Sequence, residues 1–307
     1  MTNGQGQWIN RPPLHHARAG LASATVAGSI LAIGGFRPGE GTFSFVEARG
    51  TGGNGDWQDL PPMPTPRANL SAAELGGFVY ALGGLDNGNA FLDVVERYDP
   101  QQQSWAVSPG LPEPLVGPGV VGFRGLLYVA GGEILPGGLG QVVDSVITYD
   151  PATEQWQPVA PMPTRRTRFR FVAARDHLFA VGGFRQGFQA VATVARYNPD
   201  SDTWDQVASM NEARGLPGAV VTSSGDRIVV VGGGETGHLT PNFRALHSTE
   251  IYSVDNDQWQ LHAALLAHGR GSLVCELEGS GIVLAIGGAV TNGGVMPTDL
   301  VEALDVG

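Results

Sequence analysis

The sequence contains no lysine, one cysteine and no long apolar run. Its 18 basic residues are all arginine and stand against 29 acidic residues, which gives a net charge of −11. Nucleic acid and anionic membranes need a basic partner surface, so we expect neither as the main partner. The lone thiol, Cys275, excludes an internal disulfide and a cysteine-rich metal site, and we expect no metal and no cofactor.

Helical patterning is also scarce. Charged residues make up only 15% of the chain, and no long helical period is present, whereas 46 glycines and 21 prolines indicate many tight turns. The start, MTNGQGQWINRPP, lacks the apolar core of a secretory signal, and no apolar run of about 18 residues could span a bilayer. We therefore expect an all-β protein without a membrane segment, located in the cytoplasm.

Two residue patterns recur along the chain with one period. Apolar runs end in six glycine doublets, which are Gly34-Gly35, Gly83-Gly84, Gly131-Gly132, Gly182-Gly183, Gly232-Gly233 and Gly287-Gly288. The tryptophans are Trp8, Trp57, Trp105, Trp156, Trp204 and Trp259. Successive members of both series are 48 to 55 residues apart, so the chain is a tandem array of one supersecondary unit.

Each unit contains four short runs rich in β-forming residues. In the second unit these are RANLSAAEL, FVYALGG, VVERYDP and SWAVSPGLP, with glycine or proline between them. In four units a tyrosine precedes the tryptophan by seven residues, as Tyr98 precedes Trp105. Four antiparallel strands per unit, repeated six times, predict a β-propeller of radial blades. The doublets permit close approach between neighbouring blades, and Tyr and Trp supply packing area.

A glycine doublet followed by Tyr-x6-Trp at this period resembles the kelch repeat, and the resemblance covers the whole chain. It implies a six-bladed propeller in one domain, residues 1–307, of the freestanding bacterial kind. The first unit has Gly50 in the place of the tyrosine, and the last unit ends without a tryptophan. Trp8 is therefore expected on the fourth strand of the last blade, which closes the ring. The loops after each doublet and before each first strand are expected on one face.

Shared residues build the scaffold of a repeat protein, so function is expected where the units differ. The start of the first strand carries arginine in five units, which are Arg18, Arg67, Arg166, Arg214 and Arg270. First strands line the channel of a propeller, so these arginines are expected to ring its mouth. In kelch adaptors arginines at the matching position contact acidic peptides, and the resemblance extends that role to these five. The alternative is a scaffold role, paired with carboxylates such as Asp93, Asp144, Asp299 or Glu113.

The fourth unit breaks the pattern most. Its first strand, RTRFRFVAA, places Arg166, Arg168 and Arg170 on one face by two-residue alternation. The other units have Gly20, Asn69, Gly117, Leu216 and Ser272 at the position of Arg168, and Ala22, Ser71, Gly119, Gly218 and Val274 at that of Arg170. Such a departure is typical of functional sites, and Arg168 and Arg170 are candidate ligand contacts. The alternative is an ion pair between blades.

His16, His268 and Glu212 each stand two residues before the arginine that starts a first strand. His16 and His268 belong to blades that are adjacent across the closure. Histidine titrates near neutral pH and a carboxylate can partner it, so these three residues are candidates for acid–base catalysis. Solvated loop histidines are the alternative, and no histidines have the spacing of a zinc site.

Loops after three doublets place an aromatic residue beside an arginine, in Phe36-Arg37, Phe184-Arg185 and Phe243-Arg244. Aromatic residues and arginine are common binding anchors on loops, so Phe36, Phe184 and Phe243 are candidate ligand contacts. A loop-packing aromatic beside a solvated charge is the alternative.

Two classes of function follow from these residues. The favoured one is a binding module whose arginine-rich channel mouth recognises an anionic small molecule or an acidic peptide. The other is an enzyme of isomerase, mutarotase or cyclase type that acts on a carboxylate-bearing or sugar-like molecule in the same pocket. Freestanding kelch propellers include a bacterial sialic acid mutarotase. A channel mouth that brings His16, His268 or Glu212 to Arg168 or Arg170 would favour the enzyme.

Overall fold

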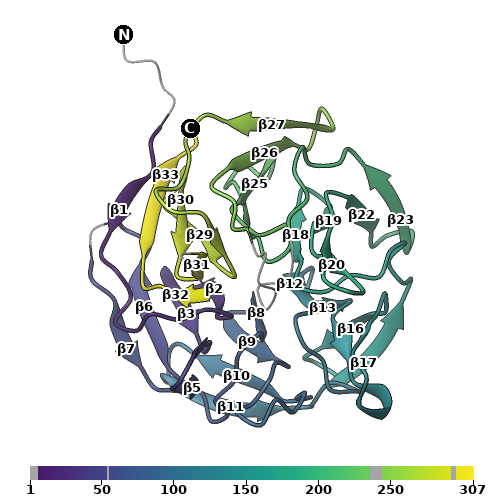
Figure 1. The fold of residues 1–307 in the computed structure, drawn as a ribbon. Coiled ribbons are helices and arrows are strands. Elements are labelled where there is room, and N and C mark those ends of the chain that lie inside the picture. Colours follow the sequence, from purple (N-terminus) through teal and green to yellow (C-terminus); the bar gives the residue numbers. More distant parts are fainter. Residues whose placement is uncertain (1–5, 54, 236–243, 292–294) are drawn as a thin grey trace.

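The computed structural model describes residues 6–53, 55–235, 244–291 and 295–307 (Figure 1). Within these ranges the regular elements are β-strands apart from one short 3-10 turn, η1 (Pro136–Gly138). The expected all-β fold is confirmed. No helix in the described residues has the length and apolar character needed to cross a membrane.

Among the described residues six sheets have four antiparallel strands each, and we number these blades 1 to 6 along the chain. Blade 1 contains β2 (Ala22–Val26), β3 (Ser29–Ile33), β6 (Val46–Gly50) and β7 (Gln58–Leu60). Blade 2 contains β8 (Ser71–Leu75), β9 (Phe78–Leu82), β10 (Val95–Asp99) and β11 (Ser104–Ser108). Blade 3 contains β12 (Gly119–Phe123), β13 (Leu126–Ala130), β16 (Val146–Asp150) and β17 (Gln155–Val159).

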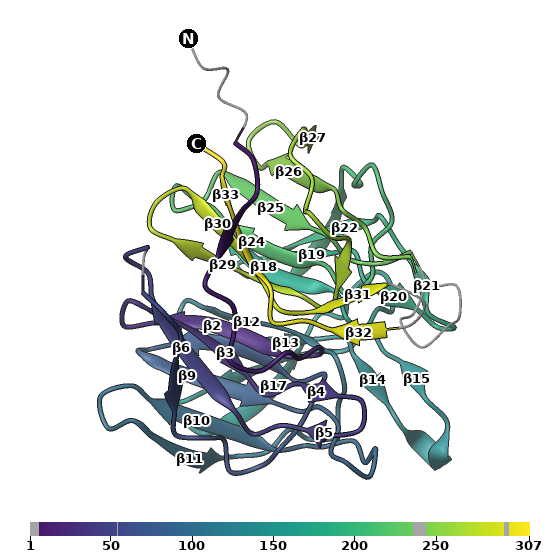
Figure 2. The same cartoon turned by 60° about the vertical axis from the view of Figure 1, so that its left-hand side comes forward.

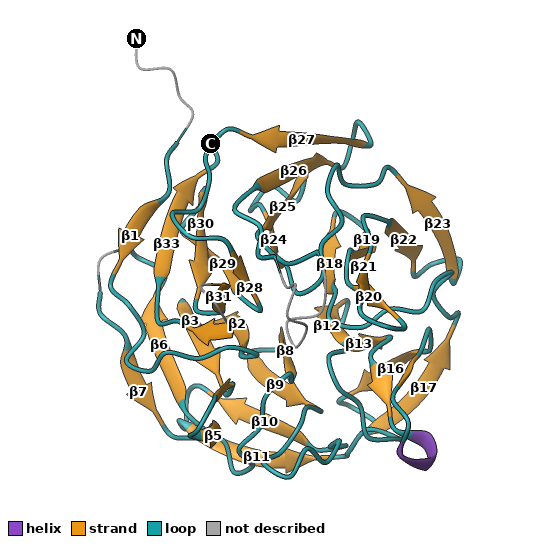
Figure 3. Cartoon of the chain, in the orientation of Figure 1, coloured by secondary structure: helices purple, strands orange, loops and turns teal. Residues whose placement is uncertain are grey.

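The remaining blades have the same order of strands from the centre outward (Figure 3). Blade 4 contains β18 (Arg170–Ala174), β19 (His177–Val181), β22 (Val194–Asn198) and β23 (Thr203–Val207). Blade 5 contains β24 (Gly218–Val221), β25 (Arg227–Val231), β26 (Thr249–Ser253) and β27 (Gln258–His262). Blade 6 contains β29 (Val274–Glu278), β30 (Ile282–Ile286), β33 (Val301–Asp305) and β1 (Ile9–Arg11).

The outer strand of blade 6 comes from the start of the chain. β1 pairs with β33 from Ile9↔Ala303 to Arg11↔Val301, and the two strands run side by side in Figures 1 and 2. Glu278, at the end of β29, lies 3.3 Å from Arg11 of β1 and 2.7 Å from Arg49 of β6. One buried carboxylate therefore links the inner and outer strands of blade 6 to blade 1.

Five of the six tryptophans connect their blade to the one before it, whereas Trp8 Nε1 has no hydrogen-bond partner among the described residues. Trp105 Nε1 donates to the carbonyl of Pro61 at 3.0 Å and its ring packs on Tyr98 with centroids 5.2 Å apart. The same bond to the preceding blade recurs for Trp57, Trp156, Trp204 and Trp259. The doublets bring blades close, because a Cβ on Gly83, at φ +60°, would lie 2.3 Å from the carbonyl oxygen of Leu115.

Short hairpins follow four of the doublets and lie on one side of the propeller, which we call the hairpin face (Figure 2). They are β4 (Phe36–Arg37) with β5 (Gly41–Thr42), β14 (Glu133–Ile134) with β15 (Gln141–Val142), β20 (Phe184–Arg185) with β21 (Gln189–Ala190), and β31 (Ala289–Thr291) with β32 (Val295–Pro297). β31 also pairs with β28 (Arg270–Gly271). The tight turns between the first two strands of each blade lie on the opposite side, which we call the turn face.

Candidate functional site

The five arginines expected at the channel mouth are buried inside the blades. Arg18, Arg67, Arg166, Arg214 and Arg270 are each 0 or 1% exposed. Four of them pair with a glutamate of the third strand, in Arg18–Glu47 at 2.6 Å, Arg67–Glu96 at 2.9 Å, Arg214–Glu250 at 3.0 Å and Arg270–Glu302 at 2.8 Å. A guanidinium this deeply buried cannot contact a solute. The expectation that these arginines line the channel mouth is therefore wrong, and they belong to the scaffold. The carboxylates that pair with four of them are not the ones named from the sequence.

Blades 3 and 4 lack this ion pair in different ways. Blade 3 has Leu115 and Ile147 at the two positions, and both pack in an apolar core. Blade 4 keeps Arg166 but has Ala195 in the place of the glutamate. The acceptors of Arg166 are the carbonyls of Ala180, Gly182 and Thr193 and the hydroxyls of Thr164 and Thr193. Burial, with a smaller contribution from the charge of Arg185, lowers the pKa of Arg166 to about 10.

A ring of backbone hydrogen bonds narrows the channel at the hairpin face. In each blade the residue two places after the buried arginine, or after Leu115 in blade 3, has a positive φ. These residues are Gly20, Asn69, Gly117, Arg168, Leu216 and Ser272, with φ between +51° and +62°. From Asn69 onward each of these residues donates its N–H to the carbonyl of the preceding member, at 2.7 to 3.0 Å. The opening that they line encloses only about 40 Å³, which is space for about one water molecule.

Arg168 belongs to this ring and is paired with a second exception to the repeat. Its Nη1 donates to Glu133 at 3.1 Å, and its guanidinium lies 5.2 Å from the centroid of the Phe188 ring. Glu133 follows the doublet of blade 3, where the other blades have Phe36, Leu85, Phe184, Gly234 and Ala289. The ion pair with Glu133 neutralises Arg168 and joins blade 4 to blade 3. For Arg168 the structure thus shows the ion pair between blades that was the alternative to a ligand contact.

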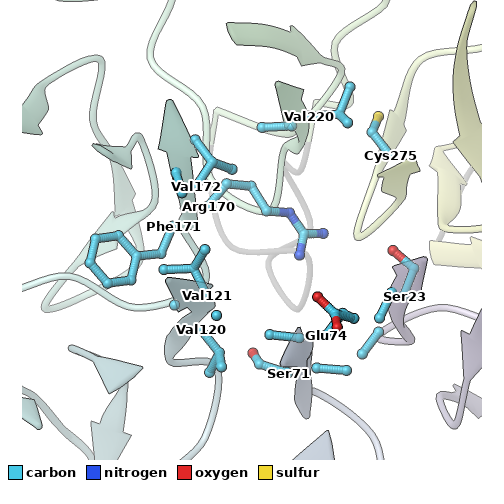
Figure 4. Close-up of a pocket in the computed structure, with 18 of the residues that line it drawn as sticks. Ser23, Ser71, Glu74, Val120, Val121, Arg170, Phe171, Val172, Val220 and Cys275 are labelled. Carbon is cyan, nitrogen blue, oxygen red and sulfur yellow. The ribbon is translucent and has the colours of Figure 1, made fainter. Parts of the chain in front are cut away.

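Beyond the ring the channel widens into a cavity of about 330 Å³ lined by the inner strands of all six blades (Figure 4). Arg170 of β18 is the only basic side chain among the described residues that line it. Its Nε donates to the carbonyl of Pro217 and its Nη2 to that of Leu273, both at 2.6 Å. These bonds use two of the five N–H donors of a guanidinium, so three remain for the cavity. Burial lowers the pKa of Arg170.

Two carboxylates line the same cavity. Glu276 of β29 accepts hydrogen bonds from the hydroxyls of Ser23 and Thr25, both at 2.7 Å, and burial raises the pKa of Glu276. Glu74 of β8 is exposed and accepts the amide of Gly77, in the adjacent turn, at 2.8 Å. The cavity thus combines one cation with two acidic groups, instead of the excess of positive charge expected from the sequence.

Cys275 also lines the channel and is buried as a free thiol (Figure 4). A Cβ on Gly218 of blade 5 would lie 2.4 Å from its sulfur, so the thiol packs closely against that blade. Burial raises the pKa of Cys275 to about 12. It is a packing residue at neutral pH, because a thiol rather than a thiolate is present.

The candidate catalytic residues are not brought together with the channel arginines. His16 Nδ1 lies 3.4 Å from Glu47 and its ring stacks on Phe45, whereas His268 is exposed. Glu212 lies 2.6 Å from the buried Arg214. Within the described ranges none of the three hydrogen-bonds to Arg168 or Arg170, so the arrangement that would favour the enzyme is not formed.

The two candidate aromatic residues that the structure describes, Phe36 and Phe184, have different environments. Phe184 is 0% exposed and packs on Phe188, with centroids 6.0 Å apart, so it belongs to the core. Phe36 is half-buried, and its backbone pairs with that of Ala19. Phe243 lies outside the described residues.

A small polar cluster lies at the edge of blade 1, where His15, Glu47 and Asp59 each place one ligand-type atom within 4.8 Å of the others. Glu47 already bonds to Arg18 and accepts the amide of His15 at 2.7 Å. The protein itself therefore satisfies this carboxylate.

We expect His15 to titrate above the usual range of histidine, because the hydrogen bond to Asp59 at 2.9 Å raises its pKa. The protonated form is favoured by folding, so this contribution to stability is present below about pH 6.5 and lost as the pH rises through the raised value. The effect on stability is small because both side chains are exposed. Asp59→Asn should lower the pKa of His15, measured by NMR titration, and leave that of His262 unchanged. An unchanged His15 would contradict this assignment.

Glu276 was not among the site residues predicted from the sequence, although it departs from the repeat as clearly as Arg170 does. Six residues after the buried arginine position stand Ala24, Ala73, Val121, Val172, Val220 and Glu276. Glu276 is the one charged residue of the six, so the comparison that singled out Arg170 identifies Glu276 once it is extended by two residues. Ser23 and Thr25 carry no comparable signal, because hydroxyl residues are ordinary in such strands.

Known proteins share both the sequence motif and the fold. The Kelch motif matches residues 66–112, 114–163 and 165–211. Kelch-like protein 36 of Bos taurus is 26% identical over 197 residues, which cover 62% of this chain and 31% of that protein. Kelch-like protein 35 of Mus musculus is 31% identical over 173 residues, which cover 56% of this chain and 28% of that protein. The chain thus spans less than a third of the length of these two relatives.

A solved structure titled "Structure of YjhT" shares the fold with a TM-score of 0.77, over 95% of this chain and 96% of that one, at 17% sequence identity. At this identity the likeness concerns the fold alone. The matched motifs, the Kelch-like relatives and the common fold confirm the expected resemblance to the kelch-repeat β-propellers.

Proposed function

We propose that this protein is a binding module that holds a small carboxylate-bearing molecule in its central channel, with Arg170 as the anchor. The observation that supports it most is a guanidinium that has three free donors and faces a cavity of about 330 Å³. Cavities of about 300 Å³ and above accommodate small ligands. The opening at the hairpin face has space for about one water molecule, so a small molecule entering from the turn face is favoured over an acidic peptide.

The guanidinium of Arg170 is oriented before a ligand arrives. Its bonds to Pro217 and Leu273 attach it to blades 5 and 6, so little side-chain entropy is lost on binding. A carboxylate fits the planar guanidinium through two parallel charge-assisted hydrogen bonds. Such an anion also neutralises a half-buried charge that has no ion-pair partner in the described residues.

The proposal is tested by measuring melting temperatures with acetate, propanoate, glutarate and inorganic phosphate. We expect a carboxylate at about 100 times its Kd to raise the Tm of the wild type by about 5 °C, and we expect no increment for Arg170→Met. Arg170→Lys keeps the charge without the planar fork and should give a smaller increment.

Arg165→Ala is the matched control, because Arg165 is 61% exposed and lies outside the channel lining. Each increment is compared with the Tm of the same variant without ligand, which separates binding from the structural bonds of Arg170. An increment that survives in Arg170→Met, or a protein that no carboxylate stabilises, would refute the proposal.

A further inference from the structure

We infer that the channel ligand is a short zwitterion of the amino-acid class, with its carboxylate on Arg170 and its ammonium group on Glu276. This inference rests on the proposed function of the channel and adds the chemistry of the second end of the ligand.

Two positions of the inner strands each carry one charged exception, and the two charges are opposite. At four and six residues after the buried arginine position, the six blades supply twelve residues, of which Arg170 and Glu276 alone are charged. The other ten are Ala22, Ser71, Gly119, Gly218, Val274, Ala24, Ala73, Val121, Val172 and Val220. A cation and an anion placed against this background complement a ligand that carries both charges.

Arg170 and Glu276 line one cavity without bonding to each other. The bonds of Arg170 go to two backbone carbonyls, and those of Glu276 come from two hydroxyls. No ion pair joins them anywhere in the described part of the chain. Opposite charges in a weakly solvated site attract strongly, so these neutral partners hold apart two groups that would otherwise approach each other.

Both groups retain bonding capacity toward the cavity. Arg170 keeps three donors, and Glu276 uses two of the roughly four lone-pair sites of a carboxylate for Ser23 and Thr25. The remaining acceptor sites of a buried carboxylate are satisfied best by a cationic donor. An ammonium group also compensates the burial of this carboxylate, which no basic side chain of the cavity offsets by direct contact.

The spacing of the two charges fits a small molecule. Arg170 donates to the carbonyl of Leu273, which stands three residues before Glu276. An extended chain rises about 3.3 Å per residue, so Leu273 and Glu276 are roughly 10 Å apart along the strand. The guanidinium bonded to Leu273 and the carboxylate of Glu276 therefore belong to one wall of the cavity. A short ligand whose charges are a few ångströms apart, as in an amino acid, can contact both.

The inference is tested by calorimetric titration of the full chain with L-alanine, β-alanine and propanoate, with 4-aminobutanoate and butanoate, and with propylamine. We expect one amino acid to bind at least about tenfold more tightly than the carboxylate of matched length. Glu276→Gln should remove this preference, and the plain carboxylate should bind this variant at least as tightly as the wild type, because a negative charge that repels it is gone. Glu74→Gln is the control, because Glu74 lines the same cavity but is exposed beside the turn of Gly77.

The outcomes separate this inference from the proposed function. Equal affinity for amino acids and plain carboxylates would overturn the zwitterion and leave carboxylate binding intact. Loss of the preference in Glu74→Gln alone would overturn the assignment to Glu276. If no compound binds, or binding is unchanged in Arg170→Met, the inference and the proposed function both fail. If Glu276→Gln does not fold, Glu276→Asp takes its place. The carboxylate of the shorter side chain is withdrawn from the ligand, so the preference should shift toward a longer amino acid. An unshifted preference would overturn the assignment.

Discussion

Glu96→Ile is expected to lower the free energy of unfolding by about 3–5 kcal/mol, whereas the double change Arg67→Leu/Glu96→Ile should lower it far less. The single change leaves the guanidinium of Arg67, which is 0% exposed, without a counter-ion and with the carbonyl of Ala81 as its hydrogen-bond partner. The double change copies blade 3, where Leu115 and Ile147 fill the same two positions with apolar packing. Urea unfolding of the three proteins measures the difference.

Blade 4 explains why this loss is not repaired locally in blade 2. Arg166 has no glutamate, but the hydroxyl of Thr193 lies 3.2 Å from it and serves as one of its acceptors. Blade 2 has Val94 at the corresponding position, so of the two hydroxyls that serve Arg166 only that of Thr164 has a counterpart, Thr65, which donates to Glu96 at 2.7 Å. If the single variant were as stable as the double variant, the glutamates would not be acting as counter-ions and this account of the arginines would be wrong.

Glu278→Gln is expected to destabilise the protein by about 3 kcal/mol or more, because it leaves the buried guanidinium of Arg49 without its counter-ion, beside the charge of Arg11. The side chains of Arg49 and Glu278 are 0% and 1% exposed, so water does not screen the loss. Because Glu278 connects β29 to β1 and to blade 1, hydrogen exchange should quicken first at Ile9–Arg11.

The matched control is Glu40→Gln, which removes a carboxylate that pairs with Arg37 at the surface at 3.0 Å. Both partners there are at least half exposed, so we expect a change below about 1 kcal/mol. Equal effects of Glu278→Gln and Glu40→Gln, or unaltered exchange of β1, would show that the ion pairs do not secure the junction of blades 6 and 1.

The glycine doublets and the tryptophans could be predicted because they perform one task from blade to blade. A doublet such as Gly83-Gly84 is needed wherever a backbone with positive φ passes close to the next blade. A tryptophan such as Trp105 is needed wherever a blade reaches the carbonyl of its neighbour. Requirements that recur at a fixed period leave a fixed period in the sequence, so pattern and structure agree.

The site was harder to predict because a period places a residue along a strand without giving the direction of its side chain. Arg166 and Arg170 are four residues apart and were expected on one face. Arg168 between them has φ +51°, which is not an extended conformation and interrupts the two-residue alternation. Arg166 consequently lies inside blade 4, whereas Arg170 lines the channel. A positive φ at a residue other than glycine is uncommon. The signal for it was Gly20, Asn69 and Gly117 at the same position of other blades, because glycine and asparagine favour this conformation.

The same limit applies to pairing between blades. Glu133 and Arg168 are 35 residues apart, and Ser23 is 253 residues from Glu276, so only the closed ring places these partners together. Their charges were readable from the sequence, but the distances that decide which charges remain available to a ligand were not.

The central claim is that the recurring arginines belong to the scaffold and that Arg170 is the binding residue. The most direct measurement is the Kd of one stabilising carboxylate for Arg170→Met and for Arg67→Leu/Glu96→Ile, determined side by side by calorimetry. We expect Arg170→Met to lose detectable binding and the double variant to bind like the wild type. Retained binding in Arg170→Met, together with lost binding in a folded double variant, would contradict it.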